Sequence, residues 1–283
     1  MDCINCDMWS EMSLKRRITS EAKAAGAAVI GFAPVARWEE YRETPPLFYP
    51  CNVYPFAKTV IVMGIPVPIP MLDTTPSIVY SELYNTTNRL LDEMAYRMTQ
   101  MLNEHNHQAA FFPRDAYGDI TILTETPQVA FSHVLAAKYA GLGTIGYNHT
   151  LLTPEFGPRV RFVSVFTDAE IEPDPMLEKE LCIHCGMCER CCPTQAFYNI
   201  GKPIAYMDKH RCARYHKRLR EHYRYPCGVC IKVCPVGNDR KLYGVNTNKY
   251  LNERQALKEN PQDPKYADWQ HIRDYGSKPL TGI

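Results

Sequence analysis

The stretch CIHCGMCERCCP, from Cys182 to Pro193, places five cysteines within twelve residues. Four of these cysteines and the final proline have the spacing C-x2-C-x2-C-x3-C-P. In bacterial ferredoxins this spacing carries [4Fe–4S] clusters: the first three thiolates bind one cluster, and the cysteine before the proline binds the other. Two-residue gaps let a tight turn reach three corners of one cube, and the longer gap leads the chain away. The stretch therefore predicts a ferredoxin-like module with two clusters.

A second set of cysteines lies downstream. Cys212 stands alone, and Cys227, Cys230 and Cys234 precede Pro235 with the spacing C-x2-C-x3-C-P. This set is a variant of the first, with its first thiolate displaced upstream, and together the eight thiolates fill two cubes and leave no iron open. The exchange of one ligand between the clusters predicts Cys182, Cys185, Cys188 and Cys234 for one cluster, and Cys192, Cys212, Cys227 and Cys230 for the other.

The alternative for so many thiols is a structural zinc site. Zinc favours four ligands in a tetrahedron, commonly from two separated C-x2-C pairs, and the closely spaced run before Pro193 fits that pattern poorly. Four cysteines remain without a cluster. Cys191 and Cys51 have no assigned ligand role, and Cys3 and Cys6 form a C-x2-C pair that is either a mobile thiol pair or a metal or redox site.

The composition is that of a globular protein of one large domain or two ordinary ones. The chain has 283 residues, 45% of them hydrophobic, and a net charge of +1. These values exclude disordered and collagen-like classes and give no overall attraction to polyanions. No apolar run reaches the roughly 18 residues of a membrane span, and no signal sequence opens the chain, so we expect a cytoplasmic protein. In that reducing compartment, twelve cysteines are metal ligands or redox groups rather than a disulfide framework.

Upstream of the cysteines, strand-like apolar runs alternate with helical patterns. Helices are expected from an N-cap at Ser10 to a closing glycine at Gly26, and over 77–104 and 127–140. Strands are expected over 27–34, 59–67, 108–113 and 159–168. This alternation indicates an α/β or α+β layer architecture.

A boundary is expected near Glu172, where the last strand gives way to an acidic segment that contains prolines. We therefore expect an α/β domain for cofactor and substrate over 1–172 and the ferredoxin-like module over 173–240. A polar tail over 241–283 is expected to pack on the first domain.

Between His133 and Asp168 the chain contains A-G-L-G-x-x-G and then L-L-x-P-x-x-G. In this order, and followed by the eight cysteines, these blocks resemble the superfamily of epoxyqueuosine reductases and corrinoid-dependent reductive dehalogenases. The resemblance implies a nitroreductase-like α/β domain that binds cobalamin with its lower ligand displaced (base-off) and receives electrons from the clusters. The expected cofactor-binding residues are Gly141, Gly143, Gly146, Tyr147 and Asn148. Without the family, the glycines either let the backbone approach a flat cofactor or only cap a helix and turn the chain.

One departure from the family concerns the proton donor. Epoxyqueuosine reductases have a catalytic aspartate fourteen residues before the first glycine of the turn, and here that position is Pro127. The chain thus resembles a short form without this aspartate, and proline transfers no proton, so another group has to do so. The candidates are Tyr117, Glu125 and His133, with Asp115 and Asp119 as further acids; a lone histidine on a helix is also compatible with a structural role.

The segment from Asp208 to Tyr225 carries seven Lys or Arg residues, two acids and three tyrosines. It is compatible with a surface that contacts tRNA phosphates, and equally with cations around negatively charged clusters and a solvated helix face.

The sequence as a whole predicts an iron–sulfur oxidoreductase that resembles epoxyqueuosine reductase and reduces its substrate, tRNA or a small molecule, at a cobalamin. The alternatives are a reductive dehalogenase-like reductase of a small molecule and an electron-transfer or activator protein without a substrate of its own. The expected electron donor is a low-potential carrier, a ferredoxin or a flavodoxin, and no membrane partner is expected.

Overall fold

The computed structural model describes residues 12–115, 117–198, 204–244 and 248–275, so Cys3, Cys6 and Ser10 lie outside the described residues. The part upstream of 173, called the sheet part below, contains α2 (Leu14–Ala24), β1 (Val29–Pro34), α3 (Ala36–Tyr41), η1 (Pro46–Phe48), α4 (Pro50–Val53), β2 (Thr59–Pro66), α5 (Ile69–Asp73), α6 (Ile78–Glu104), β3 (Ala109–Phe112), α7 (Ile120–Glu125), α8 (His133–Tyr139), β4 (Thr144–Ile145), β5 (Leu151–Leu152) and β6 (Val160–Thr167). Within the described ranges, none of the helices combines the length and the apolar character that a membrane span needs.

Four strands form one sheet in the order β1-β2-β6-β3, and all neighbouring pairs are antiparallel. The central strands β2 and β6 pair from Thr59 opposite Thr167 to Pro66 opposite Val160. Both are buried on both faces because helices cover the sheet on either side. The mixed α and β composition expected from the sequence is therefore observed, with an antiparallel sheet.

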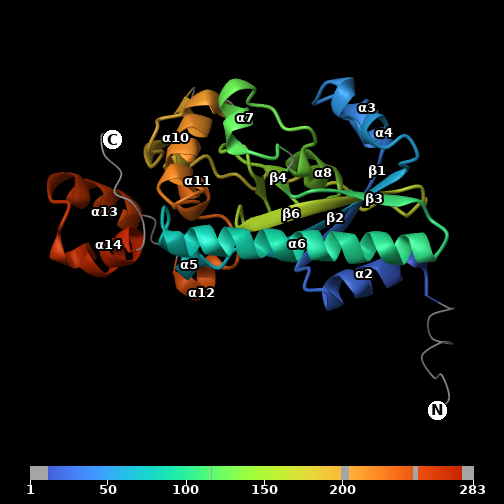
Figure 1. Ribbon diagram of the computed structural model, residues 1–283, viewed down its shortest axis with the longest axis horizontal. Coiled ribbons are helices and arrows are strands. Elements are labelled where there is room, and N and C mark those ends of the chain that lie inside the picture. The colour runs from blue at the N-terminus through green and yellow to red at the C-terminus, as the bar shows by residue number, and fades with distance from the viewer. Residues whose placement is uncertain (1–11, 116, 199–203, 245–247, 276–283) are drawn as a thin grey trace, which may run out of the picture.

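Helices lie on both sides of this sheet (Figure 1). Since side chains alternate between the faces of a strand, one set from the central strands packs against α2 and α6, namely Ile61, Met63, Val163 and Val165. The other set packs against α3 and α8, namely Val60, Val62, Phe162 and Phe166. These two layers form the core that holds the loops of the sheet part in place.

Two expected helix starts are corrected by the structure. Helix α2 begins at Leu14 with Ser13 as its N-cap, because the Ser13 hydroxyl accepts a hydrogen bond from the backbone N–H of Arg16 (3.4 Å). The helix expected from Pro127 begins only at His133. Its N-cap is Ser132, whose hydroxyl accepts from the backbone N–H of Leu135 (3.2 Å), and the residues before it form the wall of a cavity.

The cysteine module, residues 173–240, contains short elements around two similar turns. Each turn has the sequence Cys-Gly-x-Cys, and Gly186 and Gly228 adopt left-handed conformations with φ of 69° and 64° before a short helix. The elements of the module and of the segment that follows are α9 (Met187–Arg190), β7 (Phe197–Tyr198), β8 (Tyr206–Met207), α10 (Lys209–Glu221), α11 (Val229–Lys232), α12 (Arg240–Tyr243), α13 (Asn248–Glu259), η2 (Pro264–Tyr266) and α14 (Ala267–Asp274).

The module and the sheet part are interlocked through the L-L-x-P-x-x-G segment. The backbone N–H of Asn238 donates to the Pro154 carbonyl (3.1 Å), and that of Asp239 donates to the Glu155 carbonyl (2.8 Å). A Cβ atom at Gly157 would lie 1.9 Å from the carbonyl oxygen of Val236, so only glycine allows this approach.

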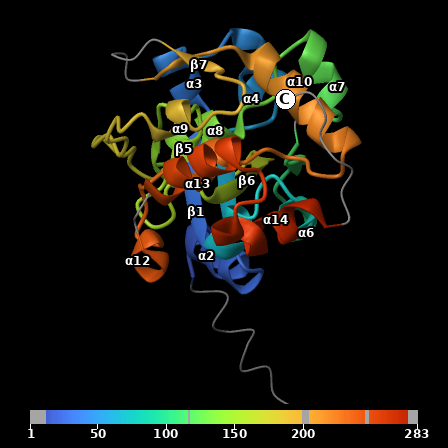
Figure 2. The same cartoon turned by 90° about the vertical axis from the view of Figure 1, so that its left-hand side faces the viewer.

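The segment after the module is helical although its sequence shows little periodicity. Tyr250 and Leu251 of α13 pack on Met187, Cys191 and Val233 of the module, while α14 contacts α6. Figure 2 shows α13 and α14 in front of the cysteine module.

Candidate functional site

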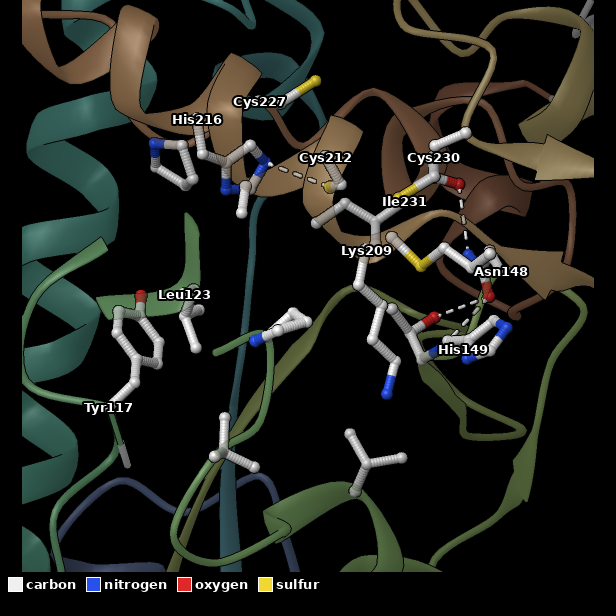
Figure 3. A pocket seen from close by; sticks show the side chains of 18 of the residues that line it. Tyr117, Leu123, Asn148, His149, Lys209, Cys212, His216, Cys227, Cys230 and Ile231 are labelled. Carbon is white, nitrogen blue, oxygen red and sulfur yellow. Dashed lines mark hydrogen bonds between the residues drawn. The ribbon is translucent and has the colours of Figure 1, made fainter. Parts of the chain in front are cut away.

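A cavity of about 870 Å³ lies between the sheet part and the cysteine module (Figure 3). Its walls come from the loop after α3, from α6 and α7, from the start of α8, from the turn before β5, and from α10 and the loop that leads into α11. Small-molecule sites typically occupy about 300 to 1,000 Å³, so this cavity has room for a large ligand. It also brings together residues that are far apart in the sequence.

The first thiol group consists of Cys182, Cys185, Cys188 and Cys234. Burial, together with the neighbouring thiols of Cys234, Cys185 and Cys182, raises the pKa of Cys188 to about 12. Burial also raises the pKa of Cys234 to about 11, with contributions from Cys185 and Cys182. These four side chains therefore lie close enough to interact electrostatically, as the exchange of ligands between the two sequence runs requires.

The second thiol group consists of Cys192, Cys212, Cys227 and Cys230, and all four line the cavity. Burial raises the pKa of Cys227 to about 12, and the thiols of Cys212 and Cys192 add to this effect. Burial raises the pKa of Cys230 well above its usual value, and Cys227 and Cys212 are the next causes; Cys188 of the first thiol group also contributes. The two groups are thus neighbours, and the second one faces the cavity.

Among the described residues, no group of three or more His, Cys, Asp or Glu side chains is arranged to hold a single metal ion. Thiolates that bind a [4Fe–4S] cluster each hold a different iron, so they surround a space instead of converging on one point. Two groups of four thiols therefore fit the donor set of two clusters better than that of a zinc ion.

Three tyrosine hydroxyls meet at one wall of the cavity. The hydroxyl of Tyr84 on α6 lies 3.3 Å from those of Tyr117 and Tyr225, and Tyr117 and Tyr225 are also hydrogen bonded to each other. Burial is the main cause that raises the pKa of Tyr117 far above its usual value, and Tyr84 and Asp115 add to it. Tyr117 is therefore protonated throughout the physiological pH range.

A cation and an anion support this tyrosine cluster. The guanidinium of Arg161 on β6 lies over the Tyr84 ring, 3.9 Å from its centre, and donates to the Asp115 carboxylate (3.2 Å) and to Asn88 (2.8 Å). The hydroxyl of Tyr84 donates to the same carboxylate (2.7 Å). The positive charge of Arg161 thus reaches the tyrosine cluster through Tyr84 and Asp115.

Of the other candidate proton donors, Asp115 lines the cavity, whereas His133, Glu125 and Asp119 do not. His133 donates from Nε2 to the Pro113 carbonyl (2.9 Å), so its Nδ1 accepts from the Ser164 hydroxyl (2.9 Å). Burial lowers its pKa to about 4, and both ring nitrogens are used, which is the arrangement of a structural histidine. Glu125 is exposed at the end of α7 and does not line the cavity.

The carboxylate of Asp119, another candidate acid, is engaged in two contacts elsewhere. It caps α7 by accepting from the backbone N–H of Thr121 (2.7 Å), and it pairs with Arg220 of α10. The hydrogen bonds of Thr121 are the main cause that lowers its pKa, so it is a poor acid.

The glycines of the A-G-L-G-x-x-G turn approach other backbone and side chains rather than the cavity. A Cβ atom at Gly141 would lie 2.2 Å from the Pro175 carbonyl oxygen, one at Gly143 would lie 1.9 Å from that of Leu152, and one at Gly146 would lie 2.9 Å from the Leu152 side chain. None of the three lines the cavity. The backbone at these glycines does make close approaches, but it approaches other parts of the same chain and not the cavity.

The two residues after this turn differ in their position relative to the cavity. Tyr147 is buried and donates to Glu189 of α9 (3.0 Å), so it joins the turn to the cysteine module. Asn148 lines the cavity and donates to the carbonyl of Cys230 (3.3 Å). In the view of Figure 3, the Lys209 side chain extends between Tyr117 and Asn148.

The position of the missing acid, Pro127, does lie at the cavity wall. Sequence reasoning missed Tyr84, Tyr225 and Arg161 because nothing in their local sequence marks them. The one available signal was that Tyr225 stands two residues before Cys227.

The fold and the site together define a class of protein: an antiparallel α+β layer structure with a large cavity that is lined by thiols of an adjoining cysteine module. No protein-family model matches the chain. The tetrachloroethene reductive dehalogenase of Dehalobacter restrictus is 27% identical over 230 residues, which are 74% of this chain and 36% of that protein. An epoxyqueuosine reductase of Lactococcus garvieae is 26% identical over 217 residues, which are 68% of this chain and 54% of that protein.

A similar fold is found among solved structures. A reductive dehalogenase whose structure suggests a mechanism for B12-dependent dehalogenation aligns with a TM-score of 0.62 and 19% identity, over 91% of this chain and 37% of that one. The resemblance to the superfamily of epoxyqueuosine reductases and reductive dehalogenases is therefore confirmed in sequence and in fold. The chain spans about a third to a half of the length of these curated relatives.

Proposed function

We propose that the chain is an iron–sulfur reductase that reduces its substrate at a cobalamin held in the cavity and fed by two [4Fe–4S] clusters. The observation that carries the proposal is that the second thiol group and Tyr117 line the same cavity. Electrons and a proton can then reach one enclosed space from two walls. The names of the sequence relatives, which are reductases, support the same class of reaction.

The cavity suits a large ligand that is mainly apolar. It offers about 870 Å³, and a few polar groups such as Asn148, His149 and Lys209 converge on it, as in typical cofactor sites. A cobalamin bound base-off and reduced by electrons from the clusters would supply Co(I), a strong nucleophile and electron donor. An electron carrier without a substrate would not need such a cavity, so this feature favours the enzyme over the electron-transfer alternative.

Tyr117 is the proposed proton donor. Its hydroxyl holds a proton at the cavity wall, Tyr84 and Tyr225 orient it through hydrogen bonds, and Arg161 supports this cluster through its contacts with Tyr84 and Asp115. Because its pKa is raised, the proton is released only when the substrate develops negative charge.

The geometry favours a small-molecule substrate. The tyrosine donor lies in the cavity, and the position of the family's aspartate is held by Pro127, which also lines the cavity. This arrangement fits reductive cleavage of a small molecule such as a halogenated phenol.

A specific surface supports the second candidate, epoxyqueuosine in tRNA. Three exposed cations, Arg211, Arg214 and Lys217, recur every three residues on α10, beside the cavity that other residues of this helix line. Such a stripe can contact successive phosphates. Arg211 also pairs with Asp208 at the start of the helix (3.3 Å), and Arg220, another cation of this segment, pairs with Asp119.

The two substrates are distinguished by one anaerobic assay. The protein is loaded with iron, sulfide and cobalamin, reduced chemically, and given either an ortho-halogenated phenol or a tRNA stem–loop that carries epoxyqueuosine. Halide release supports the small-molecule reductase, and formation of queuosine supports the tRNA enzyme. Turnover of neither substrate by protein that has both cofactors, together with reduction of an added acceptor protein, would favour the electron-transfer alternative.

The tRNA candidate has a binding test of its own. Replacement of Arg211, Arg214 and Lys217 by alanine is expected to lower the slope of log K against log salt by about one for each lost phosphate contact. Replacement of the exposed Arg16 and Lys23 on α2 is the control and should leave the slope unchanged. An unchanged slope in the α10 variant would exclude this surface from RNA binding.

A further inference from the structure

Two buried guanidinium groups donate to the same backbone carbonyl, that of the cluster cysteine Cys234. Arg159 donates to it from Nη1 (3.0 Å) and Arg240 donates to it from Nε (3.1 Å). Arg159 is 0% exposed and Arg240 is 2% exposed. Burial of a cation costs free energy unless the cation is paired. The hydrogen-bond and ion-pair partners of each arginine therefore indicate its role.

Arg159 is paired directly with a carboxylate, but its charge still reaches the Cys234 thiol, where it opposes the rise in pKa that burial causes. Its Nε and Nη2 atoms form a bidentate ion pair with Asp239, at 2.6 and 2.7 Å, and its remaining hydrogen bonds go to backbone carbonyls. It connects the start of β6 to the loop that follows Cys234, so its role is to hold this loop against the sheet part.

Arg240 is compensated differently. Its three nitrogens donate to neutral oxygens only: the Cys234 carbonyl, the Lys232 carbonyl and the Tyr250 hydroxyl (3.0 Å). Among the described residues, no carboxylate forms an ion pair with it. The Tyr250 hydroxyl donates in turn to the carboxylate of Asp73 (2.7 Å), which also forms an ion pair with Lys249 (3.0 Å). This anion therefore reaches Arg240 only across an intervening tyrosine and is shared with a second cation.

We propose that Arg240 raises the reduction potential of the cluster held by the first thiol group, and that Asp73 opposes it through Tyr250. Reduction adds one negative charge to the cluster, and a buried cation beside Cys234 stabilises that charge with little screening by water. Net charge, hydrogen bonding and exposure are the known determinants of cluster potentials. The inference rests on the proposed function for the presence of the cluster.

The test is a redox titration of the anaerobic, cluster-loaded protein, followed by EPR spectroscopy. Arg240→Gln is expected to move one of the two one-electron steps to a more negative potential. At a fixed potential, the ratio of reduced to oxidised cluster should fall about tenfold, which corresponds to a shift of about 59 mV for one electron. Arg240→Lys keeps the charge and should shift that step much less. Lys241→Gln removes an exposed cation next along α12 and is the matched control, with no shift expected.

A second variant, with an expected potential shift in the opposite direction, keeps the inference testable if Arg240→Gln loses the cluster. Asp73→Asn is nearly isosteric and removes the anion, so it should move the same step to a more positive potential. If Arg240→Gln fails to assemble the cluster, Asp73→Asn decides the question. Unchanged potentials in Arg240→Gln, equal shifts in Arg240→Lys or Lys241→Gln, or a fall in potential in Asp73→Asn would overturn the inference. Absence of iron from the unmodified protein would instead overturn the proposed function.

Discussion

The hydroxyl groups of Tyr117 and Tyr225 are hydrogen bonded to each other at the cavity wall, although Tyr225 lies two residues before the cluster cysteine Cys227. One tyrosine comes from the sheet part and the other from the cysteine module. The interface between the two parts therefore holds the proposed proton donor next to the proposed electron source.

Removal of the Tyr117 hydroxyl tests its role as the acid. Tyr117→Phe should lower turnover by about 100-fold or more, since general acid catalysis typically contributes that much, while iron content stays unchanged. Tyr96→Phe, at an exposed position of α6, is the control. Steady-state rates on the substrate that the wild-type protein reduces provide the measurement, and wild-type turnover in Tyr117→Phe would remove Tyr117 from the mechanism.

Two adjacent cysteines are expected to differ in their effect on the clusters. Cys192→Ser removes a thiol of the second group and should lower the iron content by about half, since each cluster holds four irons. Cys191 is buried against Val233 and Tyr250 and should be replaceable by serine with both clusters retained. Iron analysis and EPR of the reduced proteins distinguish the two, and loss of a cluster only in Cys191→Ser would contradict the assignment.

Gly143→Ala tests whether the glycine turn serves packing or ligand binding. Its Cβ would lie 1.9 Å from the Leu152 carbonyl oxygen, so the backbone has to shift, at a cost of several kcal/mol in the free energy of unfolding. Ser20→Ala, at an exposed position of α2, should cost less than about 0.5 kcal/mol. Denaturant unfolding measures both, and an unchanged stability of Gly143→Ala with weakened cobalamin binding would favour the ligand role.

His133 predicts a dependence of stability on pH. Burial lowers its pKa from 6.5 to about 4 in the folded protein, so between these pH values the unfolded chain binds the proton and the folded chain does not. The contribution of the neutral ring, on the order of 3 kcal/mol, is complete above pH 6.5 and is lost as the pH falls toward 4.

The measurement is the free energy of unfolding between pH 7 and pH 4. The decline should be shallower in His133→Gln than in the wild type, whereas replacement of the exposed His105 should leave the slope as it is. Parallel curves for His133→Gln and the wild type would show that this ring does not titrate in the expected range.

Sequence alone predicted the elements whose signals are local. The strands β1, β2, β3 and β6 and the long helix α6 lie within the expected ranges, because apolar periodicity and an N-cap at Ser77 act over a few residues. The division of the eight thiols into two clusters, which was inferred from their spacing, stays a prediction.

The wall of the cavity opposite the thiols could not be predicted in the same way. Tyr84, Arg161 and Tyr225 are distant in the chain and meet only through the fold. The glycine pattern did not distinguish ligand binding from packing. Glycine is required where the backbone approaches a ligand closely, and equally where it approaches the chain's own backbone, as at Gly143.

The most direct test of the account is whether the cavity binds cobalamin beside the clusters. Protein purified without oxygen and loaded with iron and sulfide is mixed with cob(II)alamin, and the EPR spectrum of Co(II) is recorded. The account predicts a base-off signal, which should weaken when the cavity is narrowed by Ala213→Trp on α10. No cobalamin binding at tens of micromolar protein, with both clusters present, would contradict it.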